Sequence, residues 1–101
     1  MTAFVPVAKV SELPPGAMKR VMVDNQRLLL ANVGGTFYAI DNTCRHQGGP
    51  LGEGTLEGGV VTCPWHMWEY DVTTGEVCAN RSNKVDTYPV KVEGDEVKVA
   101  V

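Results

Sequence analysis

Short runs of alternating hydrophobic and polar residues recur along this chain, separated by turn-forming residues. The pattern is clearest near the C-terminus, where valines occupy every second position in 90–92 and again in 97–101. A period of two is typical of a strand with one buried face, and the Glu93-Gly94-Asp95 segment between the runs predicts a hairpin turn. The same criteria predict further strands over Phe4–Val10, Met18–Val23, Arg27–Val33, Thr36–Ile40, Thr55–Thr62, Trp68–Val72 and Glu76–Ala79.

No window of eleven or more residues combines helical periodicity with caps at both ends. The chain has sixteen valines and only six leucines, a composition that favours strands. We therefore predict an all-β fold, a sandwich or small barrel of about eight to ten short strands. With 101 residues, the chain is expected to form a single domain, 1–101.

The charge distribution narrows the possible partners. Twelve acidic and nine basic residues give a net charge of −3, so we expect no nucleic-acid partner, because phosphate contacts need a basic face. The longest apolar run, Leu28–Ala31, is too short to cross a membrane, and Met1–Val7 lacks the features of a signal peptide. We therefore expect no membrane association and a cytoplasmic location.

Two segments, 42–54 and 63–67, do not fit the strand pattern. Together they contain both histidines and two of the three cysteines, in the sequences Cys44-Arg45-His46 and Cys63-Pro64-Trp65-His66. An odd number of cysteines fits a disulfide framework poorly, and without an export signal cysteines are more often metal ligands or core residues. These two segments are therefore the candidate site, since loops on a rigid β scaffold often carry function.

Two thiolates and two imidazoles are a ligand set for zinc or for an iron–sulfur cluster. The alternative interpretation is a pair of hydrogen-bonded histidines beside two buried thiols. Structural zinc sites usually have two to four residues between paired cysteines, whereas the step from Cys44 to His46 is shorter. The short step suits two loops that each offer one thiolate and one imidazole to a binuclear centre.

The pattern Cys44-x-His46…Cys63-x-x-His66, followed by Trp68-x-Tyr70, resembles the signature of the Rieske iron–sulfur proteins. The chain is most similar to the Rieske-type ferredoxins of bacterial oxygenase systems. Further similar segments are Phe37–Asp41, Thr74-Gly75 and Tyr88-Pro89-Val90. Where respiratory relatives have two additional cysteines joined in a disulfide, this chain has Gly49 and Trp65.

The resemblance implies a Rieske-like β-sandwich with two cluster-binding loops at one tip and one [2Fe-2S] cluster. Cys44 and Cys63 would hold the inner iron, and His46 and His66 the outer iron. The residues expected to surround the cluster are Gln47, Gly48, Trp65, Trp68 and Tyr70. The residues expected to dock partners are His46, His66, Trp65 and Met67.

By the same resemblance, the protein would be a one-electron carrier rather than an enzyme, and no catalytic residue is recognised. A flavin-containing NAD(P)H-dependent reductase would reduce it, and a terminal oxygenase would receive the electron. Met67 replaces the family's usual glycine, so the oxygenase remains open between a ring-hydroxylating dioxygenase and an aromatic monooxygenase. The free protein is expected to be a monomer.

Two other functions remain open: a small Rieske subunit of a larger oxidoreductase such as nitrite reductase, and a structural zinc module that binds a protein.

Three further expectations concern the surroundings of the cluster. Trp68 replaces a serine of high-potential relatives, so we predict a negative reduction potential, raised modestly if the Tyr70 hydroxyl reaches Cys63. Cys78 is expected to be a small strand residue and not a ligand. The proline-rich third loop of many relatives is missing around Ala79–Lys84, and Gly52-Glu53-Gly54 predicts a tight turn rather than a phosphate-binding loop.

Overall fold

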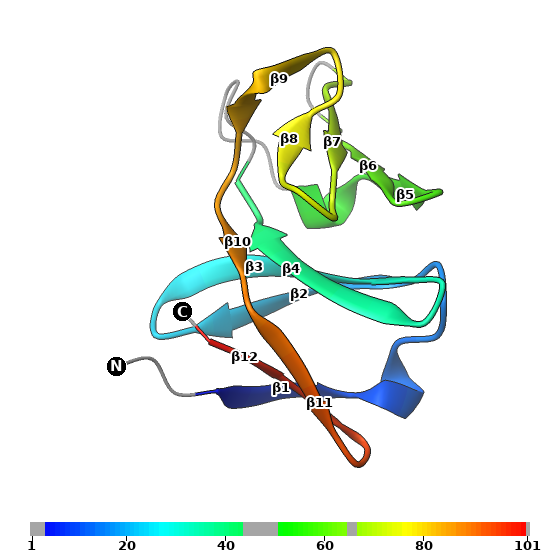
Figure 1. Ribbon diagram of the computed structural model, residues 1–101, viewed down its shortest axis with the longest axis vertical. Helices are drawn as coiled ribbons and strands as arrows, with labels where there is room; N and C mark the ends of the chain where they lie inside the picture. The colour runs from blue at the N-terminus through cyan, green and yellow to red at the C-terminus, as the bar shows by residue number, and fades with distance from the viewer. Residues whose placement is uncertain (1–3, 44–50, 65–66, 101) are drawn as a thin grey trace.

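The computed structural model describes residues 4–43, 51–64 and 67–100, which form three antiparallel sheets (Figure 1). The first has the order β1–β12–β11, with β1 at Val5–Lys9, β12 at Glu96–Val99 and β11 at Val90–Glu93. The second has the order β10–β4–β3–β2, with β10 at Thr87–Tyr88, β4 at Thr36–Asp41, β3 at Gln26–Val33 and β2 at Met18–Val23.

The third sheet is a five-stranded meander in the upper half of the molecule (Figure 1). Its strands are β5 at Thr55–Glu57, β6 at Val60–Thr62, β7 at Glu69–Asp71, β8 at Glu76–Val77 and β9 at Asn80–Lys84. Two short 3₁₀ helices complete the described chain, η1 at Val10–Glu12 and η2 at Leu51–Glu53.

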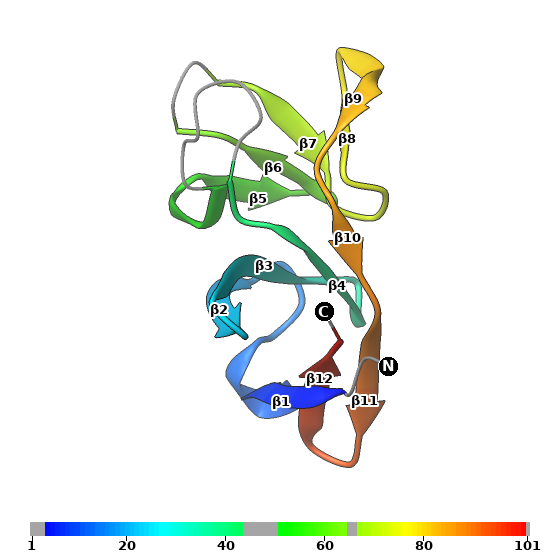
Figure 2. The ribbon, with the colours of Figure 1, turned by 90° about the vertical axis from the view of Figure 1, so that its left-hand side faces the viewer.

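The four-stranded sheet lies between the other two sheets, and the segment from β10 to β11 runs along one side of the molecule (Figures 1 and 2). Strand β3 of the four-stranded sheet is therefore covered on both faces, and each of the four residues Leu28–Ala31 is 0% exposed. A strand covered on both faces has a continuous apolar run rather than an alternating one. This explains why Leu28–Ala31 is the longest apolar run in the chain.

Successive side chains of β3 pack into two different cores, because strand side chains alternate between faces. Leu29 and Ala31 belong to the upper core, whose buried members are Leu29, Ala31, Ile40, Leu51, Val61, Cys63, Tyr70, Val72, Val77 and Val85. Leu28 and Leu30 belong to the lower core, whose buried members are Leu13, Val23, Leu28, Leu30, Phe37, Ala39, Val97 and Val99.

The predicted all-β class is confirmed, and β2 has the predicted bounds. The predicted strand Thr55–Thr62 is wrong as a single element, because Gly58 and Gly59 both adopt positive φ and turn the chain between β5 and β6. Strand β9 was not predicted, because all five of its side chains are exposed and show no alternation. It occupies the region where relatives have a proline-rich loop.

Cys78 follows β8 in the turn that leads to β9, so its expected place within a strand is wrong. Its backbone N–H still donates to the carbonyl of Glu69, at 2.8 Å, across the hairpin. The expected tight turn at 52–54 is the 3₁₀ helix η2 and the bend after it. Within the described residues, no helix has the length and apolar character needed to cross a membrane.

The two-core arrangement predicts that truncating either of two adjacent leucines destabilises the protein to a similar degree. Leu29→Ala and Leu30→Ala should each lower the free energy of unfolding by about 2–5 kcal/mol, since each leaves a cavity in a different core. Met22→Ala on the neighbouring strand, where the side chain is 60% exposed, is the matched control and should change it little. Chemical denaturation measures the free energy of unfolding of all three variants. A small decrease for either leucine variant would contradict the burial of both faces of β3.

Candidate metal centre

Of the four predicted ligands, Cys63 is the one that lies within the described residues. It follows β6 directly, is 0% exposed and belongs to the upper core. The other predicted ligands, Cys44, His46 and His66, lie outside the described residues, as do Gln47, Gly48 and Trp65. Consequently no group of three or more potential metal-binding side chains occurs within 4–43, 51–64 and 67–100, and the ligand set stays a prediction.

The β6–β7 hairpin positions Cys63. Thr62 pairs with Glu69, and one step further the Cys63 N–H donates to the Trp68 carbonyl at 2.7 Å. This bond closes the base of the second loop, so the cysteine is held by the sheet. Met67 adopts a positive φ of 60°, a conformation that residues other than glycine rarely take. The resemblance described above leads us to expect glycine at this position.

Asn42 closes the base of the first loop. The Leu51 N–H donates to the Asn42 carbonyl at 2.7 Å, and the Gly52 N–H donates to its side-chain Oδ1, also at 2.7 Å. The Asn42 N–H in turn donates to the Arg27 carbonyl on β3 at 3.0 Å. Asn42 is only 4% exposed, so these bonds are shielded from water, and they tie both ends of the first loop to the central sheet.

The bases of the two loops contact one another through η2, which lies beside β5 and β6 (Figure 2). The side chain of Leu51 packs in the same core as Cys63. A Cβ atom at Gly54 would overlap the carbonyl oxygen of Thr62, the residue before Cys63. Only glycine permits this approach of two backbones, which places the end of the first loop against the start of the second.

The chemistry of the described residues fits an iron–sulfur centre. Cys63 offers a thiol shielded from water, and the backbone closures at both loop bases hold the two loops in a fixed relation. Trp68 is half-buried and packs against the upper core, as expected for an inward-facing side chain, and Tyr70 is 0% exposed in the same core as Cys63. Contact between the Tyr70 hydroxyl and the Cys63 sulfur remains a prediction.

A polar cluster stabilises the turn after β7. The Asp71 carboxylate accepts from the Thr73 hydroxyl at 2.6 Å and from its N–H at 3.0 Å, and Arg81 on β9 contacts both Asp71 and Glu76, at 3.1 and 3.2 Å. The Thr73 hydroxyl, more than Arg81, lowers the pKa of Asp71 below its ordinary value, against a smaller effect of burial. This cluster ties the unexpected strand β9 to the hairpin that follows the second loop.

Burial raises the pKa of the Cys78 thiol above its ordinary value. Cys78 is half-buried beside exposed Glu69 and is not in the upper core. The expectation that Cys78 is not a ligand stays a prediction.

Asn42 and Gly54 support the site but were not singled out from the sequence. Asn42 stands among polar residues, and nothing in the local pattern distinguishes a buried amide from a solvated one. The glycine at 54 was recognised as part of a turn, but its close approach to Thr62 comes from tertiary packing. The available signal for both was their position at the two ends of the predicted segment 42–54.

Comparison with known proteins identifies the family. The model of the Rieske [2Fe-2S] domain matches residues 3–89. The ferredoxin component of the naphthalene 1,2-dioxygenase system of Pseudomonas aeruginosa is 37% identical over 97 residues, which is 95% of this chain and 93% of that protein. The ferredoxin component of biphenyl 2,3-dioxygenase of Rhodococcus jostii (strain RHA1) is 38% identical over 98 residues, covering 96% and 92%.

Solved structures agree with these relatives. The ferredoxin of carbazole 1,9a-dioxygenase from Nocardioides aromaticivorans IC177 matches with a TM-score of 0.89 and 31% identity, covering 96% of both chains. A chain in a complex of reduced oxygenase and oxidized ferredoxin in carbazole 1,9a-dioxygenase matches with a TM-score of 0.88 and 35% identity, covering 96% of this chain and 92% of that one. A nitrite reductase small subunit from Mycobacterium tuberculosis, 19% identical, shares the fold.

The closure by Asn42 generates a prediction. Asn42→Ala removes the acceptor of the Gly52 N–H, and a buried donor without its partner costs about 1–3 kcal/mol of unfolding free energy. We also expect faster loss of iron to a chelator, because the first loop is no longer held at both ends. The matched control is Asn80→Ala on exposed β9, where the amide oxygen accepts from the N–H and the hydroxyl of Ser82. Equal iron release from the two variants would contradict the role of Asn42.

Proposed function

We propose, because this chain belongs to the Rieske [2Fe-2S] family, that it is the one-electron carrier of a multicomponent oxygenase system. The supporting observation is the similarity over nearly the whole chain to ferredoxin components of dioxygenase systems. In this role the protein is an electron-transfer component and has no catalytic residue of its own. Residues 1–101 would act as a single domain.

The cofactor is one Rieske-type [2Fe-2S] cluster, and we propose Cys44, His46, Cys63 and His66 as its ligands. Two neutral imidazoles in place of two thiolates leave the centre less negative, so an electron is accepted more easily. When bound, the cluster supplies reversible one-electron transfer at a potential of roughly −150 to +300 mV. We place this protein in the negative part of that range, because Trp68 stands where a serine hydroxyl occurs in high-potential relatives.

The protein supplies rigidity and exclusion of water. The bonds from Cys63 to Trp68 and from Leu51 to Asn42 close both loops at their bases. The buried surroundings of Cys63 keep solvent from the thiolate side of the site. A fixed, dry ligand frame changes little between two charge states, which suits rapid electron transfer.

The proposed partners are a flavin-containing NAD(P)H-dependent reductase and a terminal oxygenase, which would dock in turn over His46, His66, Trp65 and Met67. Among these, Met67 is described and is 69% exposed. It borders a cavity of about 350 Å³ whose other lining residues include Trp68, Val77 and Ala79. An exposed apolar side chain beside a shallow cavity suits a small, short-lived interface. We further propose a monomeric, cytoplasmic carrier, since its reductant would be a cytoplasmic nucleotide.

The alternatives from the sequence receive less support. The nitrite reductase small subunit shares the fold at 19% identity, whereas the dioxygenase ferredoxins reach 37–38%. A structural zinc module does not agree with membership of an iron–sulfur family. The choice between a dioxygenase and a monooxygenase partner follows the relatives, which are named for dioxygenase systems, so we propose the dioxygenase.

The function is tested by metal analysis and spectroscopy of anaerobically purified protein. We expect two irons and two acid-labile sulfides per chain, and a reduced-state electron paramagnetic resonance spectrum with the low average g value of a histidine-ligated cluster. Cys63→Ser should abolish the spectrum, because it removes a buried ligand. Cys78→Ser is the matched control and should retain it. One zinc per chain and no visible absorbance would contradict the proposal.

Tyr70 offers a second prediction, because its buried hydroxyl lies in the same core as the proposed ligand Cys63. A hydrogen bond to a ligand sulfur stabilises the reduced state, so Tyr70→Phe should lower the midpoint potential. A bond worth about 0.5–1.4 kcal/mol corresponds to roughly 20–60 mV for one electron. The matched control is Tyr88→Phe. The Tyr88 hydroxyl donates to the side-chain oxygen of Gln26 on the central sheet, at 3.0 Å. Protein-film voltammetry measures the midpoint potentials of both variants. If Tyr70→Phe has the same midpoint potential as the unmodified protein, the Tyr70 hydroxyl does not contribute to the potential.

A further inference from the structure

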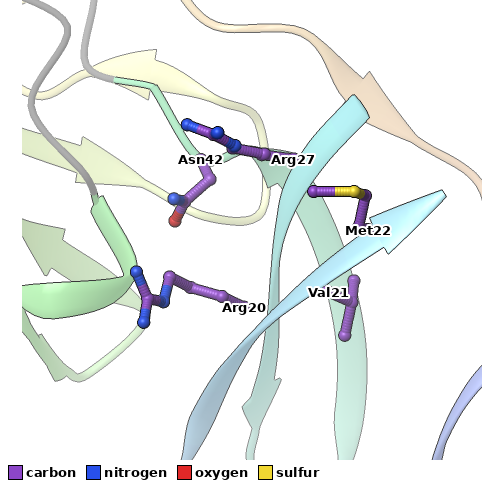
Figure 3. Close-up of a pocket in the computed structure, with 5 residues that line it drawn as sticks. All are labelled: Arg20, Val21, Met22, Arg27 and Asn42. Atoms are coloured by element: carbon purple, nitrogen blue, oxygen red, sulfur yellow. The ribbon is translucent and has the colours of Figure 1, made fainter. Parts of the chain in front are cut away.

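A cavity of about 350 Å³ opens beside the base of the first loop, where β2 ends and β3 begins (Figure 3). It is lined by Arg20, Val21, Met22, Arg27 and Asn42. In the register of the two strands Met22 lies opposite Arg27, and Arg20 lies opposite Leu29. Leu29 packs in the upper core, so the cavity continues the core-facing side of the sheet beyond the point where the five-stranded sheet covers it.

The side chains around the cavity combine cationic and apolar groups. Figure 3 shows the side chains of Arg20 and Arg27 on either side of Asn42, with Met22 beside Arg27. Met22 is 60% exposed, so its side chain is accessible to a ligand. A guanidinium presents several N–H donors in a planar fork that matches the two oxygens of a carboxylate.

The two arginines are weakly compensated. Arg20 has an ion pair with Glu53 at 4.0 Å, and both side chains are more than half exposed, so this pair contributes little. Arg27 forms no ion pair with any other described residue. Asp41 and Asp86 line a neighbouring cavity that Arg27 also borders, but neither carboxylate lies within 4.0 Å of its guanidinium. The protein as a whole carries a charge of −3, so this is a local cationic site on an acidic molecule.

We propose that this cavity, named here the Arg20–Arg27 cavity, binds a carboxylate side chain from an acidic segment of a protein partner. The inference rests on the proposed function, since a carrier must be recognised by other proteins. The two guanidiniums would hold the carboxylate, and Met22 would contact the apolar stem of the same side chain. Because Asn42 joins the cavity to the base of the first loop, a segment bound here would lie beside the proposed cluster.

Binding is tested on the holoprotein with a terminally blocked tetraglutamate peptide at low ionic strength. Nuclear magnetic resonance of ¹⁵N-labelled oxidised protein follows the backbone amides of β2 and β3 and the Nε–H groups of the arginines. We expect saturable shifts at Arg20, Met22 and Arg27. Arg27→Gln should weaken peptide binding by about three- to tenfold, because it removes a charge and a two-pronged donor. Arg27→Lys should restore only part of the loss, since the ammonium keeps the charge but not the fork.

The matched control is Lys19→Gln, which makes the same charge change on the neighbouring strand β2, at an exposed position that does not line the cavity. It should leave peptide binding nearly unchanged. If Lys19→Gln weakens binding as much as Arg27→Gln, the peptide senses only overall charge and the proposed site is wrong. Absence of saturable shifts at the cavity would equally overturn it.

The reduced-state spectrum separates this inference from the proposed function. Arg20 and Arg27 lie outside the proposed ligand set, so both Arg27 variants should retain the cluster spectrum. A failure of peptide binding with an intact spectrum would overturn the cavity proposal alone. Loss of the spectrum in the unmodified protein would overturn the electron-carrier proposal.

Discussion

Hydrogen bonds between backbone groups at the bases of the two loops are the interactions on which the site depends. Leu51 donates to Asn42 at one base, and Cys63 donates to Trp68 at the other. Each bond joins residues on either side of a loop, so each loop starts and ends at a fixed point of the scaffold. The close approach of Gly54 to Thr62 then sets one base against the other. The proposed ligands, which come from two distant parts of the sequence, would thereby be offered to a common centre.

This arrangement explains how a chain of 101 residues maintains a rigid site. A domain of this size buries a limited fraction of its surface, so its core alone leaves a small margin of stability. Here the central sheet contributes to two cores at once, because Leu28–Ala31 is covered on both faces. The upper core includes Cys63 itself, so packing of the scaffold and placement of a proposed ligand are the same interaction. We infer that binding of the cluster and folding of the upper half stabilise one another.

The fold class and the candidate ligands were predictable because they depend on local patterns. Alternating valines identify the final hairpin, and the paired cysteine and histidine residues identify the two loops. Gly34 and Gly35, between the predicted strands over 27–33 and 36–40, both adopt positive φ, as a tight turn between strands requires. By contrast, the turn at Gly58-Gly59 was overlooked, because apolar residues continue on both sides of it. Strand β9 has no apolar face, so its pairing with β8 depends on contacts such as those of Arg81, which no local pattern reveals.

The supporting residues were harder to foresee for a related reason. Asn42 is buried by tertiary packing, and its three hydrogen bonds join residues from β3 and from the far end of the first loop. Gly54 matters because its backbone lies close to the carbonyl oxygen of Thr62 on β6, a strand that follows it in the chain. In both cases the sequence shows a polar or small residue near a turn, which is common on any surface. The resemblance to a family predicts the metal ligands, whereas the residues that hold the bases of the loops could be recognised only in the structure.

The separation of the two cores has a practical consequence for anyone who wishes to attach this carrier to an electrode or to another protein. The turn between β11 and β12, at Gly94, lies at the bottom of the molecule, whereas Cys63 lies in the upper core (Figure 1). The central sheet stands between them. A change at that hairpin would affect the packing of the lower core and not that of the upper core, which contains Cys63. The hairpin is therefore a suitable place to attach a linker.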